Sequence, residues 1–444
     1  MTPGPTRILA DWLVATSGRE IPPEVRHEAV RSFVNWLGCA VGGAMHPGTQ
    51  AALRAMRPLE AAPTATLTGL RRQSDMMTAA LVNGVASHVL DFDDTHATAF
   101  IHPSAPILPA ALALAETRGL SGAALLEAFV LGVEAACRIG NAVLPSHYEI
   151  GWHITGTAGA IGAAVACGKL LGLDAERMVW AIGLGATQPV GIREHFGSMT
   201  KSFHLGRAAQ NGLLAALLAE QGFDAAEEPI AGRRGFAAIL ADGFDPSQLT
   251  EALGQRWEIQ RNTYKPFACG LVIHPAIDAC LQLRSELGFD AGAVEGVALA
   301  VHPIVMELTG KREPTSGLEG KFSVYHAAAV ALLDGAGGEV QFSDARVTAP
   351  DVVALRRRVT TTVDPAMHRE ACTAVITGRD GQVLRTELTV PLGSLGKPMS
   401  DAMLAEKFTA LTDPLLGPIA AAQLLTDAWG LASASGLGWL TANA

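Results

Sequence analysis

Apolar residues recur at helical spacing through the first half of the chain. Between Pro22 and about Leu218 the pattern runs in long segments separated by glycine or proline, among them residues 24–43, 122–143 and 177–186. Apolar side chains three or four positions apart form one face of a helix, and Gly or Pro marks where a helix ends. The first half is therefore predicted to be a stack of helices.

The pattern changes after Pro266. Residues 294–308 alternate in part between apolar and polar positions, and residues 373–390 predict two strands joined at an Asp-Gly turn. Residues 322–335, between these strands, have helical spacing. Because strands and a helix alternate here, the pattern indicates a smaller α+β unit rather than an all-β sandwich.

Helical spacing returns after Pro398. The predicted fold class is mainly α with an inserted α+β domain. A large all-helical domain comprises residues 1–264 and a C-terminal return over residues 398–444, and the inserted α+β lid domain comprises residues 265–397. Clefts between such units commonly bind ligands. We therefore expect the active site in the cleft between the two domains.

Composition and charge narrow the possible functions. The chain has 444 residues, of which 49% are apolar and 17% charged, so it can bury a large core and is not disordered. Its 33 Lys and Arg residues against 43 Asp and Glu give a net charge of −10, the wrong sign for attracting a phosphate backbone. Nucleic acid is therefore not expected as a partner.

Targeting segments and cysteines indicate the compartment. The N-terminus lacks the basic region, apolar stretch and cleavage site of a secretory signal, which favours a cytoplasmic protein. The most apolar stretch, Ile154–Gly168, is too short to cross a bilayer, so no membrane association is expected. Six cysteines lie far apart without a CxxC pair, which predicts reduced core thiols and neither a zinc site nor a disulfide framework.

Titratable residues are unusually dense in the segment from residue 88 to residue 104. It holds Asp91, Asp93, Asp94, His96 and His102. A helix end followed by a polar loop explains any single carboxylate here equally well, because Asp and Thr are common capping residues. A histidine before a proline, with carboxylates nearby, is better suited to general acid or base work. His102 is therefore a candidate catalytic residue.

A second candidate is His153, which precedes a predicted helix rich in small residues. Gly156, Gly159 and Gly162 in that helix follow no strand, so they do not form a dinucleotide-binding fingerprint. No nicotinamide or flavin cofactor is predicted.

Lysine is rare in this chain, with only seven residues, and three of them lie in stretches that also contain histidine or tyrosine: Lys201, Lys265 and Lys321. An ammonium group can bind a carboxylate or transfer a proton, so these lysines suit a site for small polyanions. Each alone is about equally well explained as solvated surface. Ser198 and Lys201 also match the SxxK pattern of serine acyl-transferases, but the accompanying S-D-N and K-T-G elements are absent from the sequence.

Five segments, taken in order, resemble the MmgE/PrpD family. They read DFDDTHATAFIHPS, GWHITGTAG, GSMTKSFHLGRAAQNG, YKPFACGLVIHP and KFSVYHAAA. The resemblance implies a helical domain with an α+β lid. It also implies a cofactor-free, metal-free enzyme, usually homodimeric, that acts on a small polycarboxylate. Members include 2-methylcitrate dehydratases, cis-aconitate decarboxylases and iminodisuccinate epimerases.

The resemblance also implies a set of site residues. The catalytic candidates are His102, His153, Lys201 and Lys265, and the substrate-binding or orienting candidates are Asp91, Thr95 and Tyr325. In the dehydratases the first motif has Asn where this chain has Asp93, so its form is more similar to the decarboxylase and epimerase branches.

These observations predict a cofactor-independent lyase that moves a proton at a carbon next to a carboxylate. An epimerase or isomerase of the same family is the nearest alternative. A non-catalytic carboxylate-binding homologue is a further alternative, because a shared fold does not guarantee turnover. A serine hydrolase would instead use Ser198 as its nucleophile.

Overall fold

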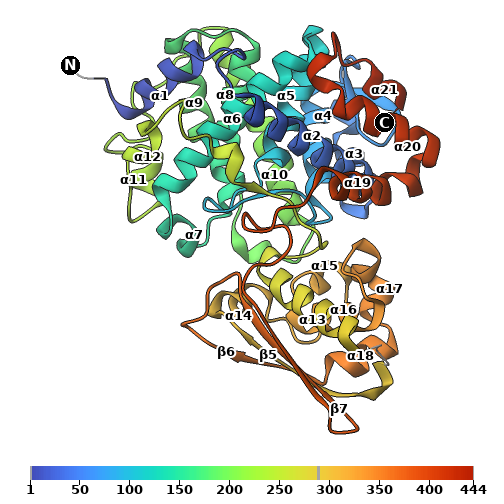
Figure 1. Ribbon diagram of the computed structural model, residues 1–444. Coiled ribbons are helices and arrows are strands. Elements are labelled where there is room, and N and C mark those ends of the chain that lie inside the picture. The colour runs from blue at the N-terminus through green and yellow to red at the C-terminus, as the bar shows by residue number, and fades with distance from the viewer. Residues whose placement is uncertain (1–2, 288–290, 444) are drawn as a thin grey trace.

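The structure, a computed structural model, describes residues 3–287 and 291–443. Figure 1 shows two units of unequal size, a large helical one and a smaller one that carries the main sheet. The helices of the large unit that precede the small one are α1 (Pro5–Ala15), α2 (Pro23–Gly43), α3 (Pro47–Met56), α4 (Met76–His88), α5 (Ser104–Arg118), α6 (Gly122–Val143), α7 (Ser146–Ile150), α8 (Ile154–Leu170), α9 (Ala175–Ala186), α10 (Thr200–Glu220), α11 (Phe236–Leu240) and α12 (Ser247–Thr250). The segments predicted as helices at 24–43, 122–143 and 177–186 are confirmed as α2, α6 and α9.

Helices α4, α8 and α10 pack closely because glycines face one another at their crossings. A side chain added at Gly84 of α4 would lie 2.6 Å from the Cα of Gly206 in α10, and one added at Gly212 would lie 2.5 Å from the carbonyl oxygen of Ala160 in α8. Three segments of the site adjoin the ends of these helices: residue 91 follows the C-terminus of α4, residue 153 precedes the N-terminus of α8, and residue 201 lies in the first turn of α10. Close crossing therefore brings these three segments together.

The smaller unit contains a four-stranded sheet in the order β6-β5-β7-β8. Its strands are β5 (Val294–Val301), β6 (Val359–Val363), β7 (Cys372–Gly378) and β8 (Val383–Leu388). β5 and β6 are parallel, whereas β5–β7 and β7–β8 are antiparallel. The predicted hairpin at 373–390 is confirmed, with Gly381 in the left-handed conformation that its turn requires (φ +81°).

Helices α13 (His274–Leu287) and α16 (Val324–Asp334) pack together against this sheet. The remaining helices of the unit are α14 (Pro303–Thr309), α15 (Gly317–Gly320), α17 (Asp344–Val347) and α18 (Pro350–Arg356). The predicted fold class, mainly α with a smaller α+β unit, agrees with this architecture.

Two expectations in this unit need correction. Only the first part of 294–308 is a strand, because the ring nitrogen of His302 accepts from the backbone of Ile304 and Pro303 starts α14. The strand β6 was not predicted at all. Its threonine-rich sequence is exposed along most of its length at the sheet edge, so it lacks the apolar alternation of a half-buried strand.

The last helices, α19 (Asp401–Leu416), α20 (Pro418–Trp429) and α21 (Trp439–Asn443), belong to the large unit, where α19 packs against α2. Two short ribbons complete the unit, β1 (Ala65–Leu67) with β2 (Arg72–Ser74) and β3 (Thr95–His96) with β4 (Asn262–Thr263). All six cysteines are buried free thiols, as predicted.

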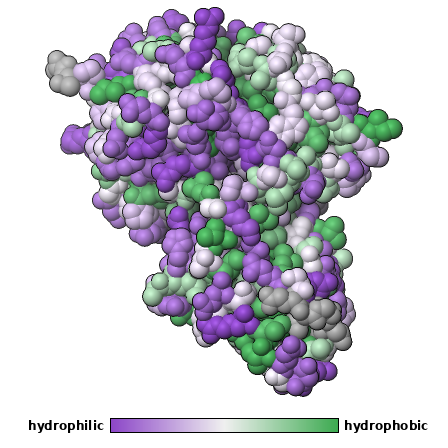
Figure 2. Space-filling model, in the orientation of Figure 1, coloured by the Kyte–Doolittle hydropathy of each residue, from purple (hydrophilic) through white to green (hydrophobic). Residues whose placement is uncertain are grey.

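The surface in Figure 2 is largely hydrophilic over the large unit, and apolar residues are more frequent near the waist between the units. Within the part of the chain that the structure describes, no helix combines the length and apolarity needed to cross a membrane.

Candidate active site

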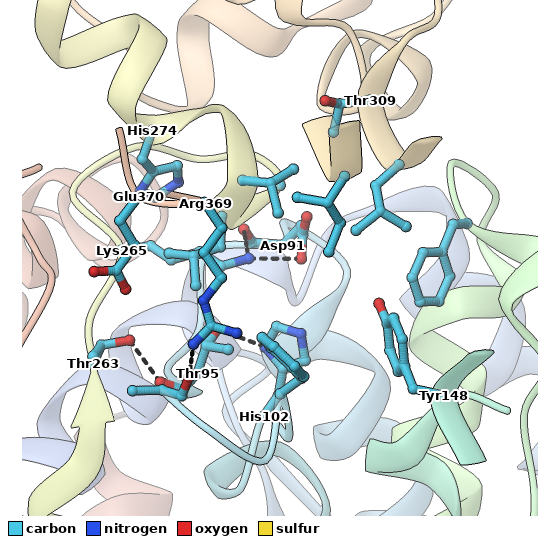
Figure 3. A pocket seen from close by; sticks show the side chains of 18 of the residues that line it. Asp91, Thr95, His102, Tyr148, Thr263, Lys265, His274, Thr309, Arg369 and Glu370 are labelled. Carbon is cyan, nitrogen blue, oxygen red and sulfur yellow. Dashed lines mark hydrogen bonds and ion pairs between the residues drawn. The ribbon is translucent and has the colours of Figure 1, made fainter. Parts of the chain in front are cut away.

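One cavity of about 250 Å³ is lined by residues from both units. The large unit contributes Asp91, Thr95, His102, His153 and Lys201, and the small unit contributes Ile304, Thr309, Phe322, Arg369 and Glu370. Lys265 also lines the cavity and lies in the segment between β4 of the large unit and α13 of the small unit. Figure 3 shows several of these side chains pointing toward one another. The volume equals that of roughly eight liquid water molecules, so the cavity suits a small ligand.

The floor of this site is the turn that follows α4, and three buried lysines hold its backbone. Lys321 Nζ donates to the carbonyl oxygen of Leu90 at 2.7 Å, Lys265 Nζ to that of Asp91 at 3.0 Å, and Lys407 Nζ to that of Phe92. Asp91 itself has a positive φ of +49°, which is uncommon for a residue other than glycine. The lysines satisfy three consecutive carbonyls that the turn leaves unpaired.

The Asp91 carboxylate lies between two ammonium groups. Its Oδ1 accepts from Lys201 Nζ at 2.7 Å and from Lys265 Nζ at 2.9 Å, and the residue is only 4% exposed. Burial alone would raise the pKa of Asp91, but Lys201 and Lys265 outweigh it and hold the pKa well below its ordinary value. One carboxylate thus balances one of the two positive charges, which leaves the cluster net positive.

The two lysines differ in proton affinity. Burial lowers the pKa of Lys201, and Asp91 only partly offsets this. For Lys265 burial also acts to lower the pKa, but Asp91 and Asp93 outweigh it and the pKa lies above its ordinary value. The Lys201 ammonium also lies 5.2 Å from the ring centre of Phe196 and 5.5 Å from that of Phe322, within the range of a cation–π contact.

His102 is held through its Nδ1. That atom lies 2.8 Å from the carbonyl oxygen of Asp94 and 3.2 Å from Thr95 Oγ1. A carbonyl can only accept, so Nδ1 carries the proton and the neutral ring has a free lone pair at Nε2. Burial holds the pKa of His102 well below its ordinary value. A neutral His102 in this tautomer is suited to act as a base.

His88 lies behind His102, with ring centres 4.6 Å apart, and its Nδ1 lies 2.8 Å from Asp93 Oδ1. Burial lowers the pKa of His88, whereas His88 and His102 lower that of Asp93 despite its burial. Most of the titratable groups noted in this segment of the sequence therefore lie in one buried network.

His153 enters the cavity from the N-terminus of α8. Its backbone N–H donates to the carbonyl oxygen of Gly191, and its Nδ1 lies 3.0 Å from Nδ1 of His204 in α10. Burial and the charge of Lys201 hold the pKa of His153 well below its ordinary value.

The structure brings six of the seven predicted site residues to the cavity and leaves out Tyr325. That residue lies within α16, and its hydroxyl is 3.0 Å from Thr361 Oγ1 in β6. Because α16 packs its buried side against the sheet, the ring of Tyr325 belongs to the core of the small unit. The sequence motif alone did not distinguish the two sides of this helix.

Other residues singled out in the sequence have structural partners. His96 lies 3.1 Å from the carbonyl oxygen of Glu258 through Nε2, and Lys321 binds Glu339 as well as the turn. Ser198 is exposed and donates to the carbonyl oxygen of His195, while Lys201 turns to Asp91. The SxxK pattern therefore does not form a nucleophile and base.

Sequence reasoning missed Arg369, which lies in the segment between β6 and β7. Its Nη2 donates to the carbonyl oxygen of Ala97 at 2.8 Å, and its guanidinium lies 4.7 Å from the ring centre of Phe100. Figure 3 shows it projecting toward Thr95 and His102. Nothing distinguishes this residue from the other arginines of the chain except its position in the fold.

Among the residues that the structure describes, two sets of side chains are close enough to hold a metal ion. The ring nitrogens of His88, His102 and His153 lie within 4.8 Å of one another, as do ligand atoms of His88, Asp91 and Asp93. Asp91, however, already bears two ammonium groups, and Asp93 is held by His88. Because these carboxylates already have cationic or imidazole partners, we assign no metal ion to the second set.

Comparison with known proteins finds two family domains in the chain, the second of which also includes α19 and α20 of the large unit. The MmgE/PrpD N-terminal domain matches residues 7–249, and the MmgE/PrpD C-terminal domain matches residues 267–431. A cis-aconitate decarboxylase of Aspergillus terreus is 26% identical over 437 residues, covering 92% of this chain and 89% of its own.

Two other relatives match over long stretches. The human cis-aconitate decarboxylase is 28% identical over 354 residues, covering 76% of this chain and 73% of its own. A 2-methylcitrate dehydratase of Cupriavidus necator is 25% identical over 442 residues, covering 91% of this chain and 90% of its own. Since the two family domains together match most of the chain, the protein belongs to the MmgE/PrpD family.

Proposed function

We propose that the protein is a cofactor-independent lyase that acts on a small di- or tricarboxylate, with a decarboxylation of the cis-aconitate type as the first candidate. The observation that carries this proposal is the buried pair of ammonium groups, Lys201 and Lys265, beside His102 and His153 in one small cavity. The decarboxylase relatives support the same class of reaction.

The lysines bind the carboxylates of the substrate in this proposal. The cluster of Lys201, Lys265 and Asp91 keeps a net positive charge, and it attracts an anion more strongly than it would in water because it is buried. Asp91 orients both ammonium groups and does not contact the substrate, since two carboxylates would repel each other. Arg369 offers a further cation on the lid side of the cavity.

The chemical step then needs one proton. The bond between the substrate carbon and the departing carboxylate breaks, CO2 leaves, and the electron pair stays on the carbon skeleton as an allylic carbanion. The fixed cations stabilise this charge, and a histidine donates a proton to the carbanion. His153 is the candidate donor because its cavity-facing nitrogen is not committed to a carbonyl, whereas His102 presents a lone pair.

Epimerisation is the second candidate. It requires one group to remove a proton from a carbon and another to return a proton to the opposite face. His102 and His153 come from different segments and both line the cavity, with ring centres 6.4 Å apart. A dehydration would use the same pair, with one ring protonating the departing hydroxide.

The test is proton NMR of EDTA-treated protein in D2O with cis-aconitate, 2-methylcitrate and iminodisuccinate. Loss of CO2 supports the decarboxylase, loss of water the dehydratase, and exchange or inversion without net loss the epimerase. No change and no deuterium exchange with any of the three acids would overturn the proposed substrates, and full loss of activity on EDTA treatment would overturn cofactor independence.

Matched variants test the residues. Lys201→Met, Lys265→Met and His153→Gln should each lower turnover by roughly 100-fold or more. Lys311→Met and His27→Gln are the controls, because both side chains are exposed and lie in ion pairs outside the cavity. Equal activity in the test and control variants would indicate a carboxylate-binding homologue or another site.

A further inference from the structure

A second histidine lies directly behind His153. His204 does not line the cavity, but its Nδ1 is 3.0 Å from Nδ1 of His153, and the residue is only 3% exposed. The ring of His195 follows, 6.0 Å from that of His204 between centres, and His195 is partly exposed to solvent. The three imidazoles thus follow one another from the cavity to a partly exposed position.

The local backbone is shaped to hold this pair of rings. Gly191 accepts a hydrogen bond from the backbone N–H of His153 and has a φ of +104°. A side chain added at Gly191 would lie 2.8 Å from the ring of His204. The chain therefore needs glycine at this position both for its conformation and to leave room for the second histidine.

A hydrogen bond between two Nδ1 atoms sets the tautomers. One nitrogen must carry the proton and the other must accept it, so in the neutral pair one ring has its proton on Nδ1 and the other on Nε2. If the proton between the rings moves, the proton on each outer nitrogen must move in the same sense to keep both rings neutral.

We propose that His204 relays protons between His153 and solvent on the His195 side, an inference that rests on the proposed function. When His153 gives its Nε2 proton to the substrate carbanion, the Nδ1 proton of His204 passes to Nδ1 of His153. In the same step a proton from solvent binds Nε2 of His204, so that this ring never loses its only N–H. Both rings are neutral before and after, and the one proton that decarboxylation consumes has come from water.

The surroundings of the pair favour such a relay. His153 and His204 face Lys201 on α10, His88 on α4, His102 and His195, whose charges lower the pKa of one or both rings. The nearest carboxylates described, Asp91 and Asp93, are bound to Lys201 and His88. A lasting imidazolium beside Lys201 would be costly in this buried place. The relay supplies the proton to the substrate without leaving a positive charge on either ring.

Three variants separate relay from orientation. His204→Asn keeps an amide that can donate to Nδ1 of His153 but cannot pass a proton on, whereas His204→Phe loses both abilities. We expect at least a tenfold loss of kcat in both, with KM unchanged, and partial rescue of His204→Gly by added imidazole. His27→Asn, an exposed histidine, is the control.

The outcomes are distinct. Wild-type kcat in His204→Asn would show that orientation suffices and would overturn the relay, as would the absence of rescue by imidazole in a His204→Gly protein that keeps its fold. A parallel measurement needs no substrate: ¹⁵N NMR of histidine-labelled protein should show one of the two rings protonated on Nδ1 and the other on Nε2. Two rings both protonated on Nε2 would overturn the relay, even if one of the three acids is turned over.

Discussion

Asp91 is the residue on which the charges of the site converge. It adopts a left-handed backbone conformation, its carbonyl oxygen and carboxylate both accept from Lys265, and its carboxylate also accepts from Lys201. A buried carboxylate with two ammonium partners is a strong constraint, because removing it leaves two like charges facing each other in a medium of low dielectric constant.

Asp91→Asn should therefore destabilise the fold as well as stop turnover. We expect a loss of about 3–5 kcal/mol in the free energy of unfolding, measured with urea. The control, Asp11→Asn, breaks an exposed pair with Arg7 and should leave the unfolding midpoint almost unchanged. A fully stable Asp91→Asn protein would contradict the view that this carboxylate balances the lysines.

A neighbouring carboxyl makes stability depend on pH. Burial and the charge of Asp93 raise the pKa of Asp94 from 3.8 to about 7. Because the folded-state pKa is the higher one, the folded protein binds more protons between about pH 4 and pH 7, and this contribution to stability is lost as the pH rises. The free energy of unfolding falls in this range by up to about 1.4 kcal/mol per pH unit.

Asp94→Asn removes this titration. We expect the variant to gain stability relative to the wild type between pH 5 and pH 8, because only the wild type must ionise the buried carboxyl. Thermal unfolding of both proteins at several pH values measures the difference. Asp224→Asn, at an exposed position, should show no such trend, and parallel pH curves for Asp94→Asn and the wild type would contradict the assignment.

At the scale of elements, the site exists because three helix ends meet. α4 delivers the Asp91 turn, α8 begins after His153, and α10 carries Lys201 in its first turn. Glycines at the crossings let the helix axes come closer than larger residues would allow. The distance between Lys201 and Asp91 thus depends on the packing of α4 against α10.

Gly206→Ala tests this dependence. An added methyl group would lie 2.3 Å from the carbonyl oxygen of Leu81, so α10 must move away from α4. We expect lower stability and at least a tenfold loss of kcat, although residue 206 does not line the cavity. Gly438→Ala, where a methyl group meets nothing within 4 Å, is the control. An unchanged kcat in Gly206→Ala would show that the site tolerates a change in the spacing of α4 and α10.

At the scale of the whole molecule, the two units are joined across the cavity by reciprocal contacts. Arg369 of the small unit donates to Ala97 of the large one, and Arg193 of the large unit pairs with Glu307 of the small one at 2.6 Å. Lys321, also from the small unit, donates to Leu90 at the floor of the site. The contacts that join the two units therefore also hold the walls of the cavity together.

Arg369→Met should weaken substrate binding. It removes a cation from the cavity and one bond between the units, so we expect KM for the substrate to rise about tenfold or more with a smaller change in kcat. Arg357→Met, at an exposed position of the same unit, serves as the control. A drop in kcat at constant KM would instead assign Arg369 to the chemical step.

The family resemblance also implies a homodimer, and light scattering of the purified protein measures this directly. We expect twice the 46.2 kDa mass of one chain. A monomer at micromolar concentration with full activity would show that one chain builds a complete site.

Much of the architecture could be predicted because it depends on local patterns. The helical periodicity of α2, α6 and α9 and the Asp-Gly turn of the β7–β8 hairpin are properties of neighbouring residues, so the sequence carries them directly. Five of the site residues also stood out, because histidine, lysine and clustered aspartates are conspicuous in an apolar chain, whereas Thr95 came only from the family resemblance.

Only the tertiary structure decided what these residues do. The pairing of Asp91 with Lys201 and Lys265 joins positions 110 and 174 residues apart, and Lys407 reaches Phe92 across 315 residues. No local sequence feature distinguishes Lys321 and Lys407, which bind backbone carbonyls, from the two lysines in the cavity. No local feature identifies Arg369 either. By itself the sequence determined most of the helices and strands and the chemical groups available to the site. Burial and long-range contacts determined the protonation state of each side chain, its partner and the side to which it points, because these depend on residues distant in the chain.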